Sequence, residues 1–185
     1  MNIYENCPIL EDDNYLLRLF DKRDLDDLLR IYSDRKALPY FNSDNCDGDN
    51  FYYATKEEMA KALDFWKMSY ENGWFTRLTI IDKKQDIIIG TIELCLRVSD
   101  DEFNNKAILR IDVNSDNEKE DVLFNLLSLI TPRINELLGS KGIITKAPIY
   151  AIDRIEALRR VGYTKSECFL KGKNDVLYGD YWIID

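Results

Sequence analysis

The sequence predicts an α/β domain in which helices lie on the faces of one mixed sheet. Short segments with the alternation of strands are interspersed with longer segments of helical periodicity. Antiparallel strands are expected first, and strands then alternate with helices, which indicates a mixed sheet. The predicted order is β-α-α-β-β-β-α-β-α-β-β. With 185 residues and no linker, the chain has the size of a single domain over residues 1–185.

The first elements follow from apolar spacing and one capping motif. Residues 15–19 are predicted as a strand, and residues 24–34 carry leucines at helical spacing. Thr55 precedes Glu58 by three residues, which is a capping box, so a second helix is expected from there to about Glu71.

The later elements alternate between strand and helix. A long helix is expected from about Glu118, with a kink or restart at Thr131-Pro132 because proline donates no backbone N–H. A fourth helix is expected over residues 149–160, ended by Gly162. The predicted strands cover residues 74–82, 87–98, 107–113, 143–146, 163–170 and 177–184, the last two as a hairpin.

Residues 35–54 form a polar loop with several acidic side chains. The loop suggests calcium binding, but Ala54 stands where an EF-hand needs its bidentate glutamate. We therefore expect a solvated loop that flanks a substrate pocket, and no metal site.

Composition excludes several kinds of chemistry. The formal net charge of −9 disfavours nucleic acid as a partner. Histidine is absent, which excludes Ser-His and Cys-His nucleophiles and histidine zinc sites. The four scattered cysteines favour reduced thiols over a disulfide framework. Without an apolar run of membrane-spanning length or a leader pattern, we expect a cytoplasmic protein with no membrane partner.

The segment from Ile108 to Leu138 has the layout of an anion site. A strand runs through a polar turn into a helix, so unpaired backbone N–H groups and the helix dipole point into the turn. The turn holds no glycine, and Glu118, Glu120 and Asp121 are acidic. The backbone layout is therefore that of an anion site, but the side chains around it are negatively charged and would repel an anion.

Three motifs resemble the GNAT superfamily of N-acetyltransferases. They are Leu16-Leu17-Arg18-Leu19-Phe20 followed by Leu28-Leu29-Arg30-Ile31-Tyr32-Ser33-Asp34, then Gly90-Thr91-Ile92-Glu93-Leu94, and finally Ala157-Leu158-Arg159-Arg160-Val161-Gly162-Tyr163. With the element order, they are most similar to the branch that acetylates N-terminal amines of ribosomal proteins and related small amines. The resemblance implies a GNAT-like acyl-CoA N-acyltransferase fold.

The resemblance also implies transfer of an acetyl group from acetyl-CoA to an amine. In that family the fourth and fifth strands splay apart, and the pantetheine arm pairs with the exposed fourth strand. Here that edge would be Ile111, Asp112 and Val113. A backbone N–H there would polarise the thioester carbonyl, which needs neither histidine nor metal.

The family's pyrophosphate loop, [QR]-x-x-G-x-[GA], is degenerate in this chain. Its key positions fall on Glu118, Asp121 and Leu123, and none matches. Repulsion of a diphosphate by these acids would cost about 1–4 kcal/mol per contact, unless they point away, and only Lys119 opposes it. The alternative is that the acids merely favour the first helical turn. The expected cofactor-binding loop comprises Glu118, Lys119, Glu120, Asp121, Val122 and Leu123.

Glu93 is the candidate general base. We expect it to share a strand face with Ile89, Thr91 and Cys95, whose apolar character would raise its pKa. The alternative is a cross-strand pair with Arg110, which would keep Glu93 ionised.

No general acid is evident, because Ala151 and Leu158 stand where the family has asparagine and tyrosine. Tyr150 is the candidate substitute, and its alternative role is packing.

Two functions stay open at this stage. The first is N-acetylation of a small-molecule amine or protein N-terminus, with Glu93 acting through water. The second is a noncatalytic GNAT-fold protein that uses the cleft for binding or association and has lost acetyl-CoA binding. The acceptor amine and the oligomeric state stay open, a homodimer included.

Overall fold

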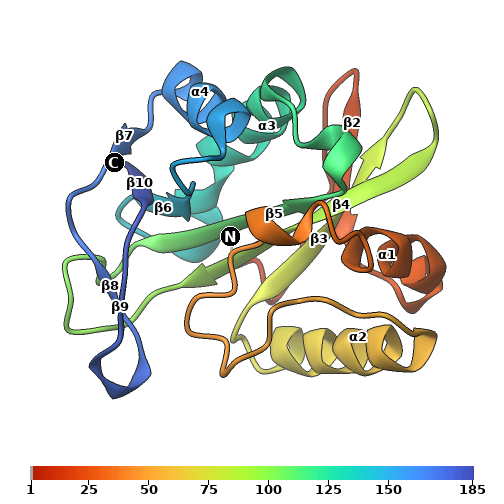
Figure 1. The fold of residues 1–185 in the computed structure, drawn as a ribbon, viewed down its shortest axis with the longest axis horizontal. Coiled ribbons are helices and arrows are strands. Elements are labelled where there is room, and N and C mark those ends of the chain that lie inside the picture. The colour runs from red at the N-terminus through yellow and green to blue at the C-terminus, as the bar shows by residue number, and fades with distance from the viewer. Residues whose placement is uncertain (1) are drawn as a thin grey trace.

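The computed structural model describes residues 2–185, which form a large mixed sheet with helices on both faces (Figure 1). The helices are α1 (Leu25–Tyr32), α2 (Lys56–Glu71), α3 (Glu120–Leu138) and α4 (Ile152–Val161). The strands of the N-terminal part are β1 (Leu10–Glu11), β2 (Tyr15–Leu19), β3 (Thr76–Asp82), β4 (Ile87–Leu96) and β5 (Ala107–Val113). Those that follow are β6 (Ile143–Lys146), β7 (Thr164–Lys165), β8 (Leu170–Lys171), β9 (Leu177–Tyr178) and β10 (Tyr181–Ile184).

The large sheet has the strand order β1-β2-β3-β4-β5-β6-β10-β7. The β5–β6 pair is parallel and the other pairs are antiparallel. The mixed sheet expected from the sequence is therefore confirmed. The expected terminal hairpin is only partly found, because its arms are divided between a β7–β10 pair and a separate β8–β9 sheet.

The two faces of the sheet are covered by different helices, α1 and α2 on one side and α3 and α4 on the other (Figure 1). The α3/α4 side holds the larger apolar core, which includes Ile92, Ile111 and Leu126. The α1/α2 side has its own cluster, in which Tyr32 and Trp66 are buried. The sheet therefore separates two cores.

Local sequence accounts for the helix limits. Thr55 accepts a hydrogen bond from the Glu58 N–H while the Glu58 carboxylate accepts one from the Thr55 N–H, so the expected capping box is confirmed. Gly139 and Gly162 follow α3 and α4 with positive φ, which glycine adopts without strain. α3 is a single helix with Pro132 inside it, so the expected restart at that position is wrong.

A β-bulge changes the face of the sheet to which the side chains at the start of β4 point. Ile80 pairs with Gly90 and Ile81 pairs with Ile88, so Ile89 is the extra residue. A Cβ at Gly90 would lie 2.2 Å from the Asp112 carbonyl oxygen, which only glycine permits. The strand therefore needs glycine at the point where it meets β5.

Across residues 2–185, no helix has both the length and the apolar character that a membrane crossing requires.

Candidate functional site

The middle of the sheet presents polar side chains to α1 and α2. Across the three central strands, Arg77 lies opposite Glu93, and Glu93 lies opposite Arg110. In the next row, Thr91 lies opposite Asp112. Because side chains alternate between faces, both rows point to the α1/α2 side while their neighbours fill the apolar core behind them.

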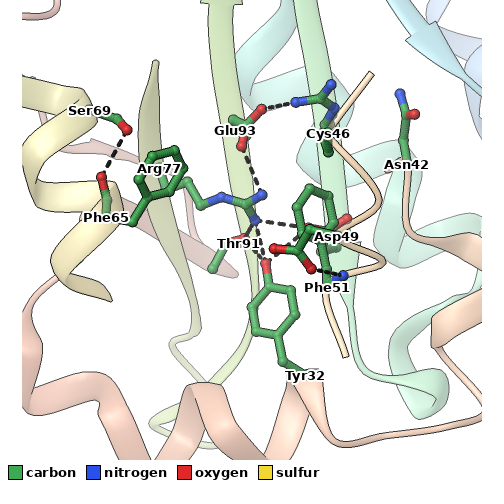
Figure 2. A network of polar contacts seen from close by, with 12 residues as sticks. Tyr32, Asn42, Cys46, Asp49, Phe51, Phe65, Ser69, Arg77, Thr91 and Glu93 are labelled. Atoms are coloured by element: carbon green, nitrogen blue, oxygen red, sulfur yellow. Dashed lines mark hydrogen bonds and ion pairs between the residues drawn. The ribbon is translucent and has the colours of Figure 1, made fainter. Parts of the chain in front are cut away.

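Arg77 is the centre of this network (Figure 2). It is 1% exposed, and its guanidinium donates to Glu93 Oε2 at 2.8 Å and to Asp112 Oδ2 at 2.9 Å. The Tyr32 hydroxyl accepts another bond from Arg77 and donates to Asp112 Oδ2 at 2.9 Å. The Trp66 ring lies 4.5 Å from the Arg77 guanidinium carbon. One buried cation therefore joins two carboxylates and an aromatic face.

The environment of Glu93 differs from the apolar one expected from sequence. Ile89 packs in the opposite core because of the bulge, so its expected place beside Glu93 is wrong. Glu93 is 3% exposed and is ion-paired with both Arg77 and Arg110. Burial alone would raise the pKa of Glu93, but the adjacent Arg110 and Arg77 guanidinium groups outweigh it and hold the pKa below its usual value. The cross-strand pair with Arg110 is confirmed.

A cavity of about 250 Å³ opens over this network. Glu93, Arg77 and Arg110 line it, together with Asn45, Cys46, Asp47 and Asp49 of the polar loop. Its other walls are aromatic: Phe51, Tyr53, Phe65, Trp66 and Phe75. Within residues 2–185, the buried Nε groups of Arg77 and Arg110 have no hydrogen-bond partner. The cavity therefore combines aromatic walls with hydrogen-bond donors and a carboxylate, and the loop flanks it.

The loop over the cavity is held by a half-buried ion pair and by hydrogen bonds. Asp44 accepts from Lys146 Nζ at 2.6 and 2.8 Å and from the Tyr181 hydroxyl at 3.1 Å. Arg110 donates to the Asp44 carbonyl oxygen at 3.1 Å. The expected solvated loop is therefore wrong at Asp44, although the loop flanks the cavity as expected. In the part of the chain that the structure describes, no three acidic or cysteine side chains gather as a metal site would require.

The two parallel strands beside the cavity separate after a short paired stretch. β5 pairs with β6 through residues 107–109 only, so Ile111 lies beyond the pairing. Arg154 Nη2 donates to the Ile111 carbonyl oxygen at 2.9 Å from the β6 side. Since the N–H and C=O of one strand residue point to the same edge, the Ile111 N–H also faces this opening.

Arg154 of α4 contacts the β5 edge of the opening and holds Glu118. Arg154 is 4% exposed, and its Nε and Nη2 atoms each lie 2.7 Å from a Glu118 carboxylate oxygen. Arg160, also on α4, pairs with Glu120 at 2.7 Å and with Asp121 at 2.9 Å. The acidic loop is thus neutralised by two arginines, and the expectation that Lys119 alone opposes its charge is wrong.

Two further features of the loop differ from expectation. Val122 and Leu123 were expected in the cofactor-binding loop, but the Leu123 side chain is fully buried in the α3/α4 core and Val122 packs against the same core. The Asp34 carboxylate accepts a hydrogen bond from the Ser115 N–H at 2.8 Å. A carboxylate of the protein therefore takes one backbone donor of the strand-to-helix turn.

Tyr150 joins the chain segments in front of the opening. Its hydroxyl donates to the Pro39 carbonyl oxygen at 2.7 Å, and its ring meets Tyr40 edge-on with centroids 6.0 Å apart. The side chain is 55% exposed. Tyr150 therefore makes a contact across the mouth of the opening. Its role as general acid stays a prediction.

Sequence reasoning missed Arg77 and Arg154, whereas it named Glu93, Arg110, Asp112 and Glu118 separately. Arg77 alternates with apolar residues in β3, so its position opposite Glu93 could have been read from strand alternation. Arg154 lacked such a signal, because its partner Glu118 is 36 residues away in the sequence.

Comparisons with known proteins agree on the fold. An acetyltransferase of the GNAT family from Bacillus anthracis has 13% identity and a TM-score of 0.69, covering 96% of this chain and 98% of its own. A ribosomal-protein-S5-alanine acetyltransferase from Vibrio fischeri has 14% identity and a TM-score of 0.70, with 95% and 94% covered. A spermidine N-acetyltransferase from Vibrio cholerae, solved with CoA and spermine, has 13% identity and a TM-score of 0.63, with 93% and 92% covered.

No protein-family profile matches this sequence, and no curated protein matches it. Sequence identities this low support similarity of fold and no more specific conclusion. The splayed β5 and β6 strands, the four helices and the agreement over nearly the whole length of these N-acetyltransferases establish that the chain has the GNAT fold.

Proposed function

We propose that the protein is an N-acetyltransferase that moves an acetyl group from acetyl-CoA to the amine of a small molecule or a protein N-terminus. The main support is the opening between β5 and β6, which lies next to the cavity that contains Glu93. Arg110 lines the cavity and its neighbour Ile111 faces the opening, so an acetyl donor and an amine acceptor would meet at these two residues. The structural neighbours that acetylate proteins or spermidine agree with such a reaction.

The Ile111 N–H fits the donor, since it lies beyond the strand pairing, whereas the Ile111 carbonyl oxygen accepts from Arg154. Bound acetyl-CoA supplies an activated acetyl group. In this proposal the Ile111 N–H donates to the thioester carbonyl oxygen and stabilises the charge that develops on it. This backbone donor needs no protonation change and is fixed by the sheet.

Glu93 positions the attacking amine in the cavity. Its carboxylate stays ionised because two arginines hold its pKa below the usual value, so it is a weak proton acceptor and a strong hydrogen-bond acceptor. The amine would therefore be oriented by Glu93 and lose its proton through water. Tyr150 is proposed to protonate the leaving thiolate after its contact with Pro39 opens.

The experiment offers acetyl-CoA together with each of a panel of amines and N-terminal peptides. The release of free CoA thiol measures the rate of transfer. We expect turnover, and we expect Glu93→Gln to lower kcat/KM by on the order of 100-fold on a responsive amine. Glu136→Gln, an exposed acid-to-amide change on α3, is the matched control and should leave the rate unchanged. Equal rates for Glu93→Gln and the native protein would exclude the role of Glu93.

A noncatalytic binding function is the second candidate. The observation that favours it is the Arg154–Glu118 pair in the opening, together with Asp34 on the Ser115 N–H. These contacts occupy groups that a phosphate-bearing donor would use. Calorimetry decides between the two functions, because no heat and no thermal shift at millimolar acetyl-CoA would leave only the noncatalytic one.

A further inference from the structure

Arg154 lies where the separated strands meet the loop before α3. Its Nη2 atom donates both to the Ile111 carbonyl oxygen and to Glu118, and its Nε atom donates to the second Glu118 oxygen. The side chains of Arg154 and Glu118 are 5% and 6% exposed. A buried cation therefore sits at the strand edge, neutralised by one carboxylate from a neighbouring segment.

Glu118 comes from an irregular part of the chain. It follows a short 3-10 turn, has φ of −74° and ψ of 66°, and precedes Lys119, the N-cap residue of α3. Its carboxylate is thus carried by a connection and not by the regular helix. The chain can turn Glu118 away without breaking the hydrogen-bond ladder of α3.

A cavity of about 120 Å³ lies next to this ion pair. Glu118, Arg154, Tyr150 and Tyr40 line it, with Ala151 at its edge. The guanidinium fork that now binds a carboxylate in a bidentate way matches the geometry of a phosphate equally well. There is space beside Arg154 for part of an incoming anion, and its full entry requires Glu118 to leave.

The surface acids of the same loop do not share this position. Glu120 and Asp121 pair with Arg160, which is far more exposed than Arg154. These exposed pairs are screened by solvent and are weak. Glu118 alone therefore decides whether the buried guanidinium is available.

We propose that Arg154 is the anion-binding group of the donor site, and that Glu118 is an internal competitor that occupies it in the absence of a ligand. The ligand class is a phosphate or diphosphate ester, and its identification with acetyl-CoA rests on the proposed function. The acidic loop then regulates donor binding instead of abolishing it. Release of Glu118 from Arg154 is the step that opens the site.

The test compares Glu118→Gln with the native protein by calorimetry, using inorganic pyrophosphate and CoA as separate probes. Glu118→Gln removes the competing charge and keeps the shape of the side chain, so we expect at least about tenfold tighter binding of both probes. Glu136→Gln should bind as the native protein does. Adding Arg154→Gln to Glu118→Gln should abolish the gain.

Thermal unfolding covers the case in which a variant is unstable. Glu118→Gln leaves a buried guanidinium without its counter-charge, so its Tm should fall in anion-free buffer and recover with pyrophosphate. The double variant Glu118→Gln/Arg154→Gln should show no such recovery. A merely structural ion pair would produce the fall in Tm without the recovery.

The outcomes separate this inference from the proposed function. Equal affinity of the native protein and Glu118→Gln for both probes would overturn the competitor role, whether or not acetyl transfer occurs. Tighter pyrophosphate binding by Glu118→Gln, without acetyl transfer to any amine, would support the competitor role and contradict the transferase. Tighter CoA binding accompanied by faster acetyl transfer would support both.

Discussion

Two buried arginines, Arg77 and Arg154, hold the two sides of this molecule in different ways. Arg77 lies in the middle of the sheet and is shared by Glu93, Asp112, Tyr32 and aromatic rings. Arg154 lies on a helix beside the strand opening and has one carboxylate and one backbone carbonyl oxygen. The first arginine is therefore enclosed by many partners, whereas the second depends on a single side chain.

This difference separates a structural cation from an exchangeable one. Removing one partner of Arg77 leaves the others in place, and no ligand could replace them together without opening the sheet. Removing Glu118 takes away the only carboxylate bound to Arg154 among the described residues. We therefore expect a ligand to exchange with Glu118 at Arg154, whereas Arg77 stabilises the fold and holds Glu93 in place at the cavity.

The largest expected effect comes from Arg77→Met. It leaves Glu93 and Asp112 buried with reduced compensation, and breaking such pairs costs about 3–5 kcal/mol. Urea unfolding followed by circular dichroism measures the free energy of unfolding. A loss below about 1 kcal/mol would contradict the role of Arg77 as the centre of the network.

The second effect is coupling between Glu118 and Arg154. We expect Glu118→Leu alone to destabilise by about 3–5 kcal/mol, whereas Glu118→Leu with Arg154→Met should lose much less, because the unpaired charge is gone. A double-mutant cycle by urea unfolding gives the coupling energy. Additive losses would show that the two side chains do not act as a pair.

The third effect is a dependence of stability on pH. The pKa of Glu93 is lower in the folded protein than its usual value of 4.5, so ionised Glu93 stabilises the fold above about that pH. This contribution is lost as pH falls through the folded pKa. The stability difference between the native protein and Glu93→Gln should therefore be largest near neutral pH and should shrink in acid. A difference that stays constant between pH 7 and pH 3 would contradict the ion-paired state of Glu93.

The smallest effect is expected from Tyr150→Phe at the mouth of the opening. The variant loses one hydrogen bond to the Pro39 carbonyl oxygen on a half-exposed side chain, so about 0.5–1.5 kcal/mol of stability should be lost. If the contact also restricts entry, CoA should associate faster with the variant in stopped-flow measurements. Tyr40→Phe is the control. It keeps the ring that packs on Tyr150 and leaves the hydrogen bond from Tyr150 to Pro39 in place.

Several elements were predictable from local sequence with little error. The strands Ala107–Val113 and Ile143–Lys146 have the limits expected from alternation, and Thr55 caps its helix as expected. The pairing of Glu93 with Arg110 was also accessible, because neighbouring antiparallel strands place such residues opposite each other. These features depend on near neighbours in the chain or on one strand pairing.

The face of Ile89 could not be predicted in the same way. A single extra residue in β4 reverses the alternation, and the bulge that produces it is set by the approach of Gly90 to the β5 backbone. The pKa of Glu93 depends on the arginines that the strand pairing places opposite it, Arg77 on one side and Arg110 on the other. Local patterning thus predicted the pair with Arg110 and missed the pair with Arg77.

The sequence by itself determined the order of the helices and of the central strands, the lack of histidine and an acidic strand-to-helix turn. Only the tertiary structure decided what those acids do, since Arg154 and Arg160 reach them from a helix more than 30 residues away in the chain. The physical reason is that the field at a carboxylate depends on the nearest charges in space, and a count of acids along a loop omits cations that folding brings beside them.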